Sequence, residues 1–540
     1  MGSGILGVAL SGLSAAQAGI ATAEHNISNA NTVGYRRQEV TFSALSPQYT
    51  GSGYFGTGVG VDTVRSIYSQ FLDSEVRLNQ SQLSRNQTYT SYASQVDSLL
   101  GSDSSSLNTA LDSFFAAVNE LANDPTSNAA RQVLLSSANT LAGQANTLYT
   151  QLQGYITASN AEVSGLTSQI NTYTGQIAQL NGDIAKAEAG GGGTANDLRD
   201  QRDQLIGELN KLVDVSVVEQ SDGTLNLFVG SGQSLVVGTN AYTMSTTTDP
   251  NDSSLLIPTL NVGGTVVTLD TGLITGGQLG GVLAVREEVI QPAQEDLDRI
   301  TLSFATEFNA LHTAGLDLNL AAGGDFFTNP VTGAAGNSGV LTLSLGNDLN
   351  LQNSDYSLTY DGTNYTLTRL SDGTAFTGSL AAVTASEGFS LSLGTTTAAA
   401  GDSWTINLKG YAGDMAALIT DTSKIAAAGA TADGPGDNSN ALALAALQTQ
   451  SFLNNGTVTF SSAYAQTVSR TASLAAEADL NVQTFSSLTD LATAAQQNVS
   501  GVNLDEEAVN LVRFQQAYQA AARALQVASS LFDDLLGVLG

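Results

Sequence analysis

Both ends of the chain carry apolar residues at the spacing of paired helices. From position 504 to 539, large apolar side chains and alanines recur four and three residues apart, and polar residues interrupt the series only twice. The first 27 residues follow the same spacing. The residues predicted to form the contact between the two helices, here called the seam, are Leu6, Leu10, Leu13, Ile20, Ile27, Leu504, Leu511, Tyr518, Leu525, Phe532, Leu536 and Leu539. This pattern predicts one long helix at each chain end and favours their pairing as a coiled coil.

Length and glycine content indicate when these helices form. An unbroken helix over residues 504–539 would be about 54 Å long, so its apolar stripe needs a partner along most of that length. The N-terminal segment contains Gly4, Gly7, Gly12 and Gly19, and each helical glycine costs about 1 kcal/mol relative to alanine. We therefore expect both ends to be disordered in the monomer and to fold on assembly. The alternative is an ordinary two-helix contact that closes one domain, and the pattern alone leaves both open.

Between the two ends, the periodicity changes several times. Helical spacing dominates residues 66–215 and includes a long antiparallel helical hairpin, with the turn at 190–193. Alternating residues and the turn Asp222-Gly223 then predict strands, and a second such block contains Asp361-Gly362. Helical spacing returns after about residue 412 and is interrupted at 434–436.

The order helix, strand, helix, strand, helix predicts a multidomain α+β protein. In it, β-rich outer domains are inserted into a long helical stalk whose ends meet in the terminal coiled coil. The expected divisions begin with an N-terminal assembly helix and turn motif (1–65), the first part of the stalk (66–215) and a β-rich insertion (216–280). They continue with a helical segment and loop (281–334), a second β-rich insertion (335–410), the returning stalk (411–500) and a C-terminal assembly helix (501–540).

Composition excludes several functional classes. The formal charge is −31 and only 12% of residues are charged, so basic patches for nucleic acid are lacking. Cysteine is absent, which excludes disulfides, thiolate nucleophiles and cysteine metal sites. The sequence contains no basic residue before His25 that would begin a secretory signal, and we expect no membrane-inserted segment. A cytosolic location and export without such a signal both remain open.

The sequence gives little evidence for a catalytic or metal site. Asp505, Glu506 and Glu507 are adjacent carboxylates, but Asn503 stands where a helix N-cap is expected and Glu506 completes an Asn-x-x-Glu capping box. The two histidines are far apart in sequence, and the segment 317–325 lacks the terminal glutamate of a calcium loop. We expect no catalytic site, no metal and no cofactor.

A polar motif follows the first predicted helix. It reads Asn26-Ile-Ser-Asn-Ala-Asn-Thr-Val-Gly-Tyr-Arg-Arg-Gln38. Its asparagines can bond to local backbone, Gly34 permits a sharp exit from the helix, and Tyr35 can anchor the turn. From these residues alone the segment is a helix stop. It is also similar to the signature of the axial proteins of the bacterial flagellum, in which the matching positions are Asn26, Asn29, Asn31, Gly34, Tyr35, Arg36 and Gln38.

Three segments make the resemblance more specific. The form Gly-Tyr-Arg-Arg-Gln at 34–38, the stretch 196–205 and the stretch 500–518 each resemble the FlgK family of hook-filament junction proteins, also called hook-associated protein 1. They occur in the order of that family, whereas hook and rod proteins usually have Gly-Phe and a lysine in the first segment. The two β-rich blocks resemble the family only in their place along the chain and in their general sequence pattern.

The resemblance implies a structural, non-enzymatic subunit. It implies export through the flagellar type III apparatus with the help of an export chaperone, and an extracellular position in the flagellum. The implied partners are further copies of the chain, hook subunits, the second junction protein and the filament. Two alternatives remain: another axial protein such as hook, and a secreted adhesin whose region 216–410 binds glycans.

Overall fold

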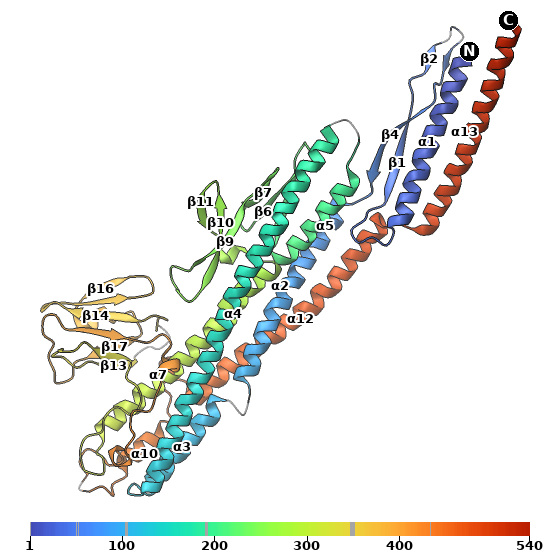
Figure 1. The fold of residues 1–540 in the computed structure, drawn as a ribbon. Coiled ribbons are helices and arrows are strands. Elements are labelled where there is room, and N and C mark those ends of the chain that lie inside the picture. The colour runs from blue at the N-terminus through green and yellow to red at the C-terminus, as the bar shows by residue number, and fades with distance from the viewer. Residues whose placement is uncertain are drawn as a thin grey trace.

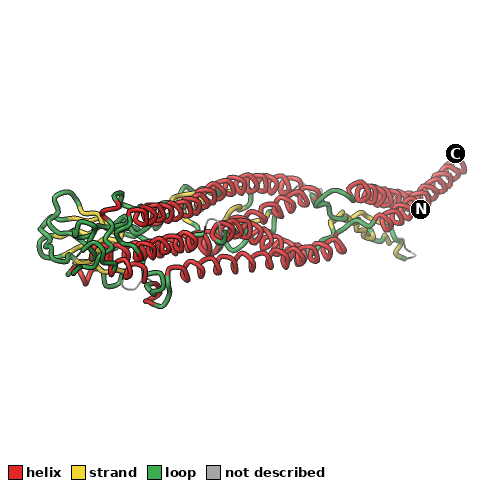
Figure 2. Tube along the Cα trace, turned by 90° about the horizontal axis from the view of Figure 1, so that it is seen from below, coloured by secondary structure: helices red, strands yellow, loops and turns green. Residues whose placement is uncertain are grey.

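The protein is an elongated rod with β-rich domains along one side (Figure 1). The computed structural model describes residues 2–49, 51, 53–102, 106–189, 193–345, 351–432 and 434–539. Both chain ends lie together at one tip of the rod, and the view from below shows the same elongated outline (Figure 2). The predicted α+β architecture, with paired terminal helices, a helical stalk and inserted β-rich domains, is confirmed.

The terminal end contains two antiparallel helices and a β-hairpin. The helices are α1 (Gly2–Asn29) and α13 (Leu504–Leu539). Strand β1 (Gln38–Ala44) pairs antiparallel with β4 (Val59–Ser66), and the short strands β2 (Gln48–Tyr49) and β3 (Tyr54–Phe55) extend the hairpin. Within the described residues, only Gly4–Asn29 is long and apolar enough to cross a bilayer. Helices of soluble proteins and signal sequences meet the same criterion of length and composition, so the expectation of no membrane-inserted segment stays a prediction.

The stalk is a bundle of long helices from distant parts of the chain. Side-chain caps start three of them, because Ser69, Ser106 and Thr459 each accept a hydrogen bond from a backbone N–H in the first turn. The main helices are α2 (Gln70–Leu100), α3 (Leu107–Asn123), α4 (Asn128–Ala189), α5 (Asn196–Leu212), α6 (Gly277–Val285), α7 (Gln291–Ala314) and α12 (Phe460–Ser500). A π-helical turn, η3 (Arg286–Ile290), joins α6 to α7.

The first β insertion follows α5 and packs on the upper half of α4. One sheet has the order β5-β6-β7-β8 and the other β11-β10-β9. The strands are β5 (Val215–Glu219), β6 (Leu225–Val229), β7 (Gln233–Val237), β8 (Asn240–Ala241), β9 (Thr243–Thr248), β10 (Leu256–Val262) and β11 (Thr265–Thr268). A 3-10 turn, η2 (Thr271–Leu273), leads to α6. The insertion therefore ends before α6 begins at Gly277, a few residues earlier than the expected division at 280.

The second β insertion projects from the lower part of the stalk. Its five-stranded sheet has the order β12-β18-β14-β15-β16, and β13 pairs with β17 beside it. The strands are β12 (Val331–Gly333), β13 (Thr342–Leu345), β14 (Tyr356–Tyr360), β15 (Tyr365–Arg369), β16 (Ala375–Gly378), β17 (Phe389–Ser392) and β18 (Ser403–Ile406). The predicted hairpin at Asp361-Gly362 joins β14 to β15.

The returning chain differs from the prediction. We expected helices from about 412 to 500, but a long helix begins only at Phe460. Among the described residues before it lie the short α9 (Tyr411–Asp414), α10 (Ser439–Ala446) and α11 (Leu453–Gly456) and the 3-10 turn η5 (Thr422–Lys424). Helix α8 (Leu380–Val383) lies within the second insertion. The left-handed backbone of Asn454 and Asn455 and the sequence Gly434-Pro435-Gly436 break any continuous helix here.

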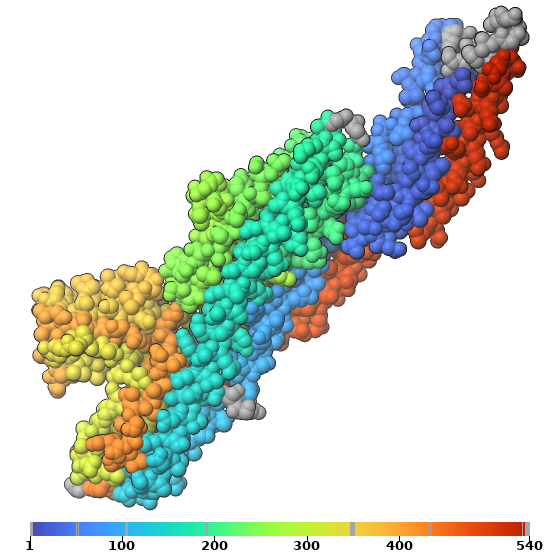
Figure 3. Space-filling model, viewed as in Figure 1, coloured from blue at the N-terminus to red at the C-terminus, as the bar shows by residue number. Residues whose placement is uncertain are grey.

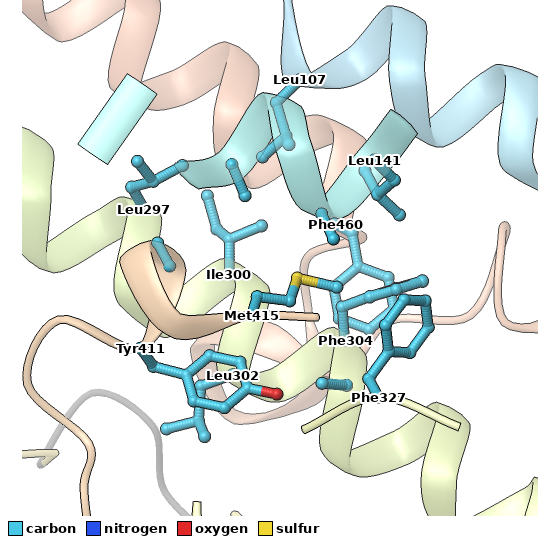
Figure 4. Close-up of a cluster of buried hydrophobic side chains, with 14 of the residues drawn as sticks. Leu107, Leu141, Leu297, Ile300, Leu302, Phe304, Phe327, Tyr411, Met415 and Phe460 are labelled. Atoms are coloured by element: carbon cyan, nitrogen blue, oxygen red, sulfur yellow. The ribbon is translucent and has the colours of Figure 1, made fainter. Parts of the chain in front are cut away.

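An aromatic core holds the lower stalk together. Phe304 and Phe327 have ring centroids 5.3 Å apart, and Phe304 also meets Phe460 of α12 edge to face at 5.6 Å (Figure 4). Tyr411 is buried, and its hydroxyl donates to the carbonyl of Thr328. Segments from the middle and the end of the chain thus share one core.

Asparagines along α4 fix the inserted domains to the stalk. The amide of Asn171 donates to the carbonyl of Met244 and accepts from its N–H, at 2.8 and 2.7 Å. Asn160 and Asn181 make the same kind of paired bonds to the first β insertion, and Asn146 donates to the carbonyls of Ala412 and Met415. A side chain with both a donor and an acceptor can satisfy strand backbone that no neighbouring strand covers.

Candidate functional site

Small residues of α1 form its contact with α13. The buried positions are Ala9, Ala15, Ala16, Gly19, Ala23 and Asn26, and all except Ala15 lie at spacings of three, four or seven residues. A Cβ atom added to Gly12 would lie 3.7 Å from the Cβ of Ala521, and one added to Gly19 would lie within 2.7 Å of several ring atoms of Phe514. Glycine at these positions therefore permits the close approach of the two helices.

On α13 the contacting positions follow a heptad. They are Glu507, Leu511, Phe514, Tyr518, Ala521, Leu525 and Ala528, all buried or half-buried. Three of the predicted seam residues, Leu511, Tyr518 and Leu525, belong to this series. The side chains of Phe532, Leu536 and Leu539 lie outside the described part of the structure.

On α1 the most buried positions are not those of the predicted seam. Leu10 is 59% exposed, and Leu6, Leu13, Ile20 and Ile27 are half-buried; Leu504, at the start of α13, is 52% exposed. The small residues lie one position earlier than the predicted series. Two closely packed helices need small side chains at their contact, whereas the prediction followed the large apolar side chains. The alanines and glycines at heptad spacing were the sequence signal that could have shown this.

The motif after α1 closes a compact turn. Asn26, nearly fully buried, exchanges two hydrogen bonds of 2.9 Å with the backbone of Gln38 and accepts a third from the hydroxyl of Tyr35 at 2.7 Å. Gly34 has a φ of +81°, which favours glycine. Asn29 donates to the carbonyl of His25 at 3.1 Å. Of the motif asparagines, Asn31 is exposed.

Arg36 links the terminal end to the stalk. Its guanidinium donates to Asp73 of α2 at 2.7 Å and to Asp203 of α5, and its backbone N–H donates to Asp200. The guanidinium also lies 5.1 Å from the ring centroid of Tyr68. Burial lowers the pKa of Arg36, but the carboxylates of Asp203 and Asp73 outweigh it and raise the pKa. Burial raises the pKa of Asp200 to about 6.

Two chain segments, 66–69 and 500–503, cross from the terminal end to the stalk at this level, and the turn 30–37 between α1 and β1 lies against them; we call the three segments together the joint. They are tied together by backbone bonds, because the N–H of Arg37 donates to Ser500 and its carbonyl accepts from Ile67, both at 2.8 Å. Gln38 adds a bond to Asp197 of α5. The α5 partners lie in the stretch 196–205 that resembles the family, but nothing in the sequence indicated that they or Asp73 of α2 pair with Arg36.

The start of α13 has the expected cap in part. The side-chain oxygen of Asn503 accepts from the N–H of Asp505 at 3.0 Å. Glu506 instead forms an ion pair with Arg37 at 3.1 Å, across the joint. Only the Asn503 half of the capping box is thus present among the described contacts.

Other candidate chemistry belongs to the fold. His312 is buried, with Nδ1 2.7 Å from the carbonyl of Gly324, and its Nε2 accepts from the N–H of Ala426. Asp317 accepts from the N–H groups of Asn319 and Ala321 in a turn. Within the described residues, no group of three His, Cys, Asp or Glu side chains is placed to hold a metal ion.

These features define a rod-shaped structural subunit whose chain ends pair beyond an ion-paired joint. Family models match residues 93–327, described as the FlgK helical domain, and 331–408, described as a D2-like domain of flagellar hook-associated protein 1. Models of flagellar basal body rod proteins match 6–36 and 495–538.

Relatives match along the whole chain. Flagellar hook-associated protein 1 of Salmonella typhimurium is 35% identical, and that of Escherichia coli 34%, each over 99% of this chain and 100% of the relative. The solved structure of the flagellar hook junction protein FlgK from Burkholderia pseudomallei superposes with a TM-score of 0.64 at 27% identity, over 79% of this chain and 100% of that one. The chain therefore belongs to the flagellar hook-associated protein 1 (FlgK) family, and it is a structural axial subunit of the bacterial flagellum. The resemblance inferred from the three segments is confirmed.

Proposed function

We propose that this chain assembles at the junction of hook and filament by folding its terminal helices against neighbouring subunits. Its partners would be copies of itself, hook subunits, and the second junction protein with the filament beyond it. It would reach that place through the flagellar export apparatus, accompanied by a chaperone while its ends are unfolded. The role is mechanical and calls for no catalysis.

The observation that carries this proposal is the uncovered apolar surface of the terminal pair. Ile5, Val8 and Leu10 of α1 and Val509 and Val512 of α13 are exposed in the single chain. Exposed apolar residues along two adjacent helices are typical of an interaction surface. On α1 few charges oppose such burial, since this helix contains only one acidic residue, Glu24.

A substitution in the helix contact tests the proposal. Leu525→Asp places a charge against α1 and should block incorporation into flagella while the stalk and both β insertions stay folded. Burial of one leucine contributes about 1.5 to 3 kcal/mol, and the buried charge adds a further cost. Incorporation is measured by immunoblot of isolated flagella, and folding by circular dichroism.

Leu525→Met is the matched control, because it keeps an apolar side chain of similar volume. It should be incorporated like the wild type. Normal junctions made with Leu525→Asp would contradict the proposed assembly.

A further inference from the structure

The end of the β1–β4 hairpin presents an uncovered aromatic surface, here called the hairpin tip: Leu45, Tyr49, Tyr54 and Phe55. These side chains are between 44% and 75% exposed, and the rings of Tyr49 and Tyr54 lie 5.3 Å apart. Residues 42–61 contain no Lys, Arg, Asp or Glu. An exposed, uncharged cluster of this kind fits an apolar protein surface.

A second uncovered apolar surface lies on α13. Val527 and Leu531, one helical turn apart, are 58% and 52% exposed. We call them the outer face of α13, because the neighbouring Leu525 and Ala528 occupy the side packed toward α1. The stretch 524–532 is also uncharged.

The hairpin tip and the outer face of α13 lie at the same level of the rod. Gly58, which precedes β4 on the returning side of the hairpin, packs on Val8 and Ser11 of α1. The hairpin tip lies beyond Gly58, toward the start of α1. Gly12 lies opposite Ala521, so the antiparallel helices place the first turns of α1 beside Val527. Figures 1 and 3, which share one view, show the hairpin and α13 on either side of α1. Nearer the joint the hairpin also reaches α13, where the ring centroids of Phe42 and Phe514 lie 6.2 Å apart.

We infer that the hairpin tip of one copy of this chain packs against the outer face of α13 in the next copy. This inference rests on the proposed assembly and names the surfaces that meet. Two unlike faces on opposite sides of one subunit make a heterologous contact, which generates a ring or a helical array instead of a closed pair. Both faces are uncharged, so they can meet without the repulsion expected between chains of net charge −31.

The absence of cysteine allows a direct test. Tyr54→Cys and Val527→Cys are introduced together into the full-length chain, which is expressed as the only copy in flagellated cells. Isolated flagella are oxidised and separated on a non-reducing gel. We expect a ladder of dimers, trimers and larger multimers, because each subunit offers one cysteine to each neighbour. A bond between the two cysteines of one chain would leave that chain a monomer on the gel, so only bonds between copies produce the ladder.

Single variants and a displaced pair are the controls. Tyr54→Cys or Val527→Cys alone should give no species beyond a dimer. Tyr54→Cys with Val512→Cys should give no ladder, because Val512 lies about 22 Å along α13 from Val527. A ladder from this displaced pair alone, or no ladder from the first pair in flagella that contain the variant, would overturn the inference. Absence of the wild-type chain from isolated flagella would instead refute the proposed function itself.

Discussion

At the scale of single residues, buried charges concentrate at the joint. Arg36 meets carboxylates from two stalk helices, and Gln496 of α12 donates to the same Asp73 at 2.6 Å. A planar guanidinium can satisfy two carboxylates at once, which a lysine ammonium does less well. Arg36 therefore sets how the terminal end sits on the stalk.

Replacing Arg36 should loosen the joint. Arg36→Met removes the cation that is hydrogen-bonded to Asp73 and Asp203, leaves Arg77 as the cation within electrostatic reach of both, and should lower the free energy of local opening by about 3 kcal/mol. Hydrogen exchange of residues 66–69 and 500–503 measures this opening. Arg65→Met is the control, because Arg65 pairs with Glu39 where both side chains are more than half exposed, and it should cost less than about 1 kcal/mol. Equal exchange rates in the two variants would refute the role of Arg36.

His312 should make stability depend on pH. Burial lowers its pKa; Asp325 and Asp317 favour the charged form and Arg131 opposes it, but burial is the largest effect. The unfolded chain therefore binds the proton more readily than the folded chain. The contribution of His312 is present above about pH 6.5 and is lost as the pH falls toward its lowered folded pKa.

His312→Leu leaves Ala426 and Gly324 without their partners and should cost about 2 kcal/mol at neutral pH. Thermal unfolding at about pH 7.5 and at about pH 5 should show a smaller difference between variant and wild type at the lower pH. Burial raises the pKa of Asp298 to about 7. Because Asp298 is present in both proteins, its effect on stability cancels in the difference between variant and wild type. A difference that grows on acidification would contradict this reasoning.

At the scale of elements, the terminal pair shows what sequence could and could not predict. The heptads correctly predicted two helices and their pairing, since apolar spacing alone defines them. The register of α1 was missed because the prediction for this helix followed its large apolar residues and passed over Gly12, Gly19 and the alanines. The turns at Asp222-Gly223 and Asp361-Gly362 were predicted correctly, because their backbone requirements are local. Asp73, Asp200 and Asp203 were missed, because only the tertiary fold brings them to Arg36.

Two glycine substitutions separate packing from helix propensity. Gly19→Ala and Gly7→Ala should each stabilise an isolated helix by about 1 kcal/mol. Only Gly19→Ala clashes with Phe514, whereas a Cβ at Gly7 meets no atom within 4 Å. Gly19→Ala should therefore reduce incorporation into flagella, measured by immunoblot, and Gly7→Ala should not. Equal incorporation of both variants would show that α1 and α13 do not pack this way in the assembly.

At the scale of the whole molecule, the stalk and insertions form a body distinct from the terminal pair. Limited proteolysis of the purified monomer should trim the chain from both ends to a core that begins near the joint, because α1 and α13 lack the large shared core of the stalk. Mass spectrometry of the fragments defines the boundaries. Resistance of the full-length monomer would mean that the terminal pair is already folded before assembly.

The pairing of helices in this chain is nested: α1 pairs with α13 on the outside, and α2 pairs with α12 inside it. Inner contacts must form across shorter stretches of chain, so loop entropy favours folding from the middle outward. The outermost pair can then open and close without breaking any contact that holds the inner bundle. Because this order follows from connectivity, the two chain ends can thread a narrow passage and still fold last, each beside the other.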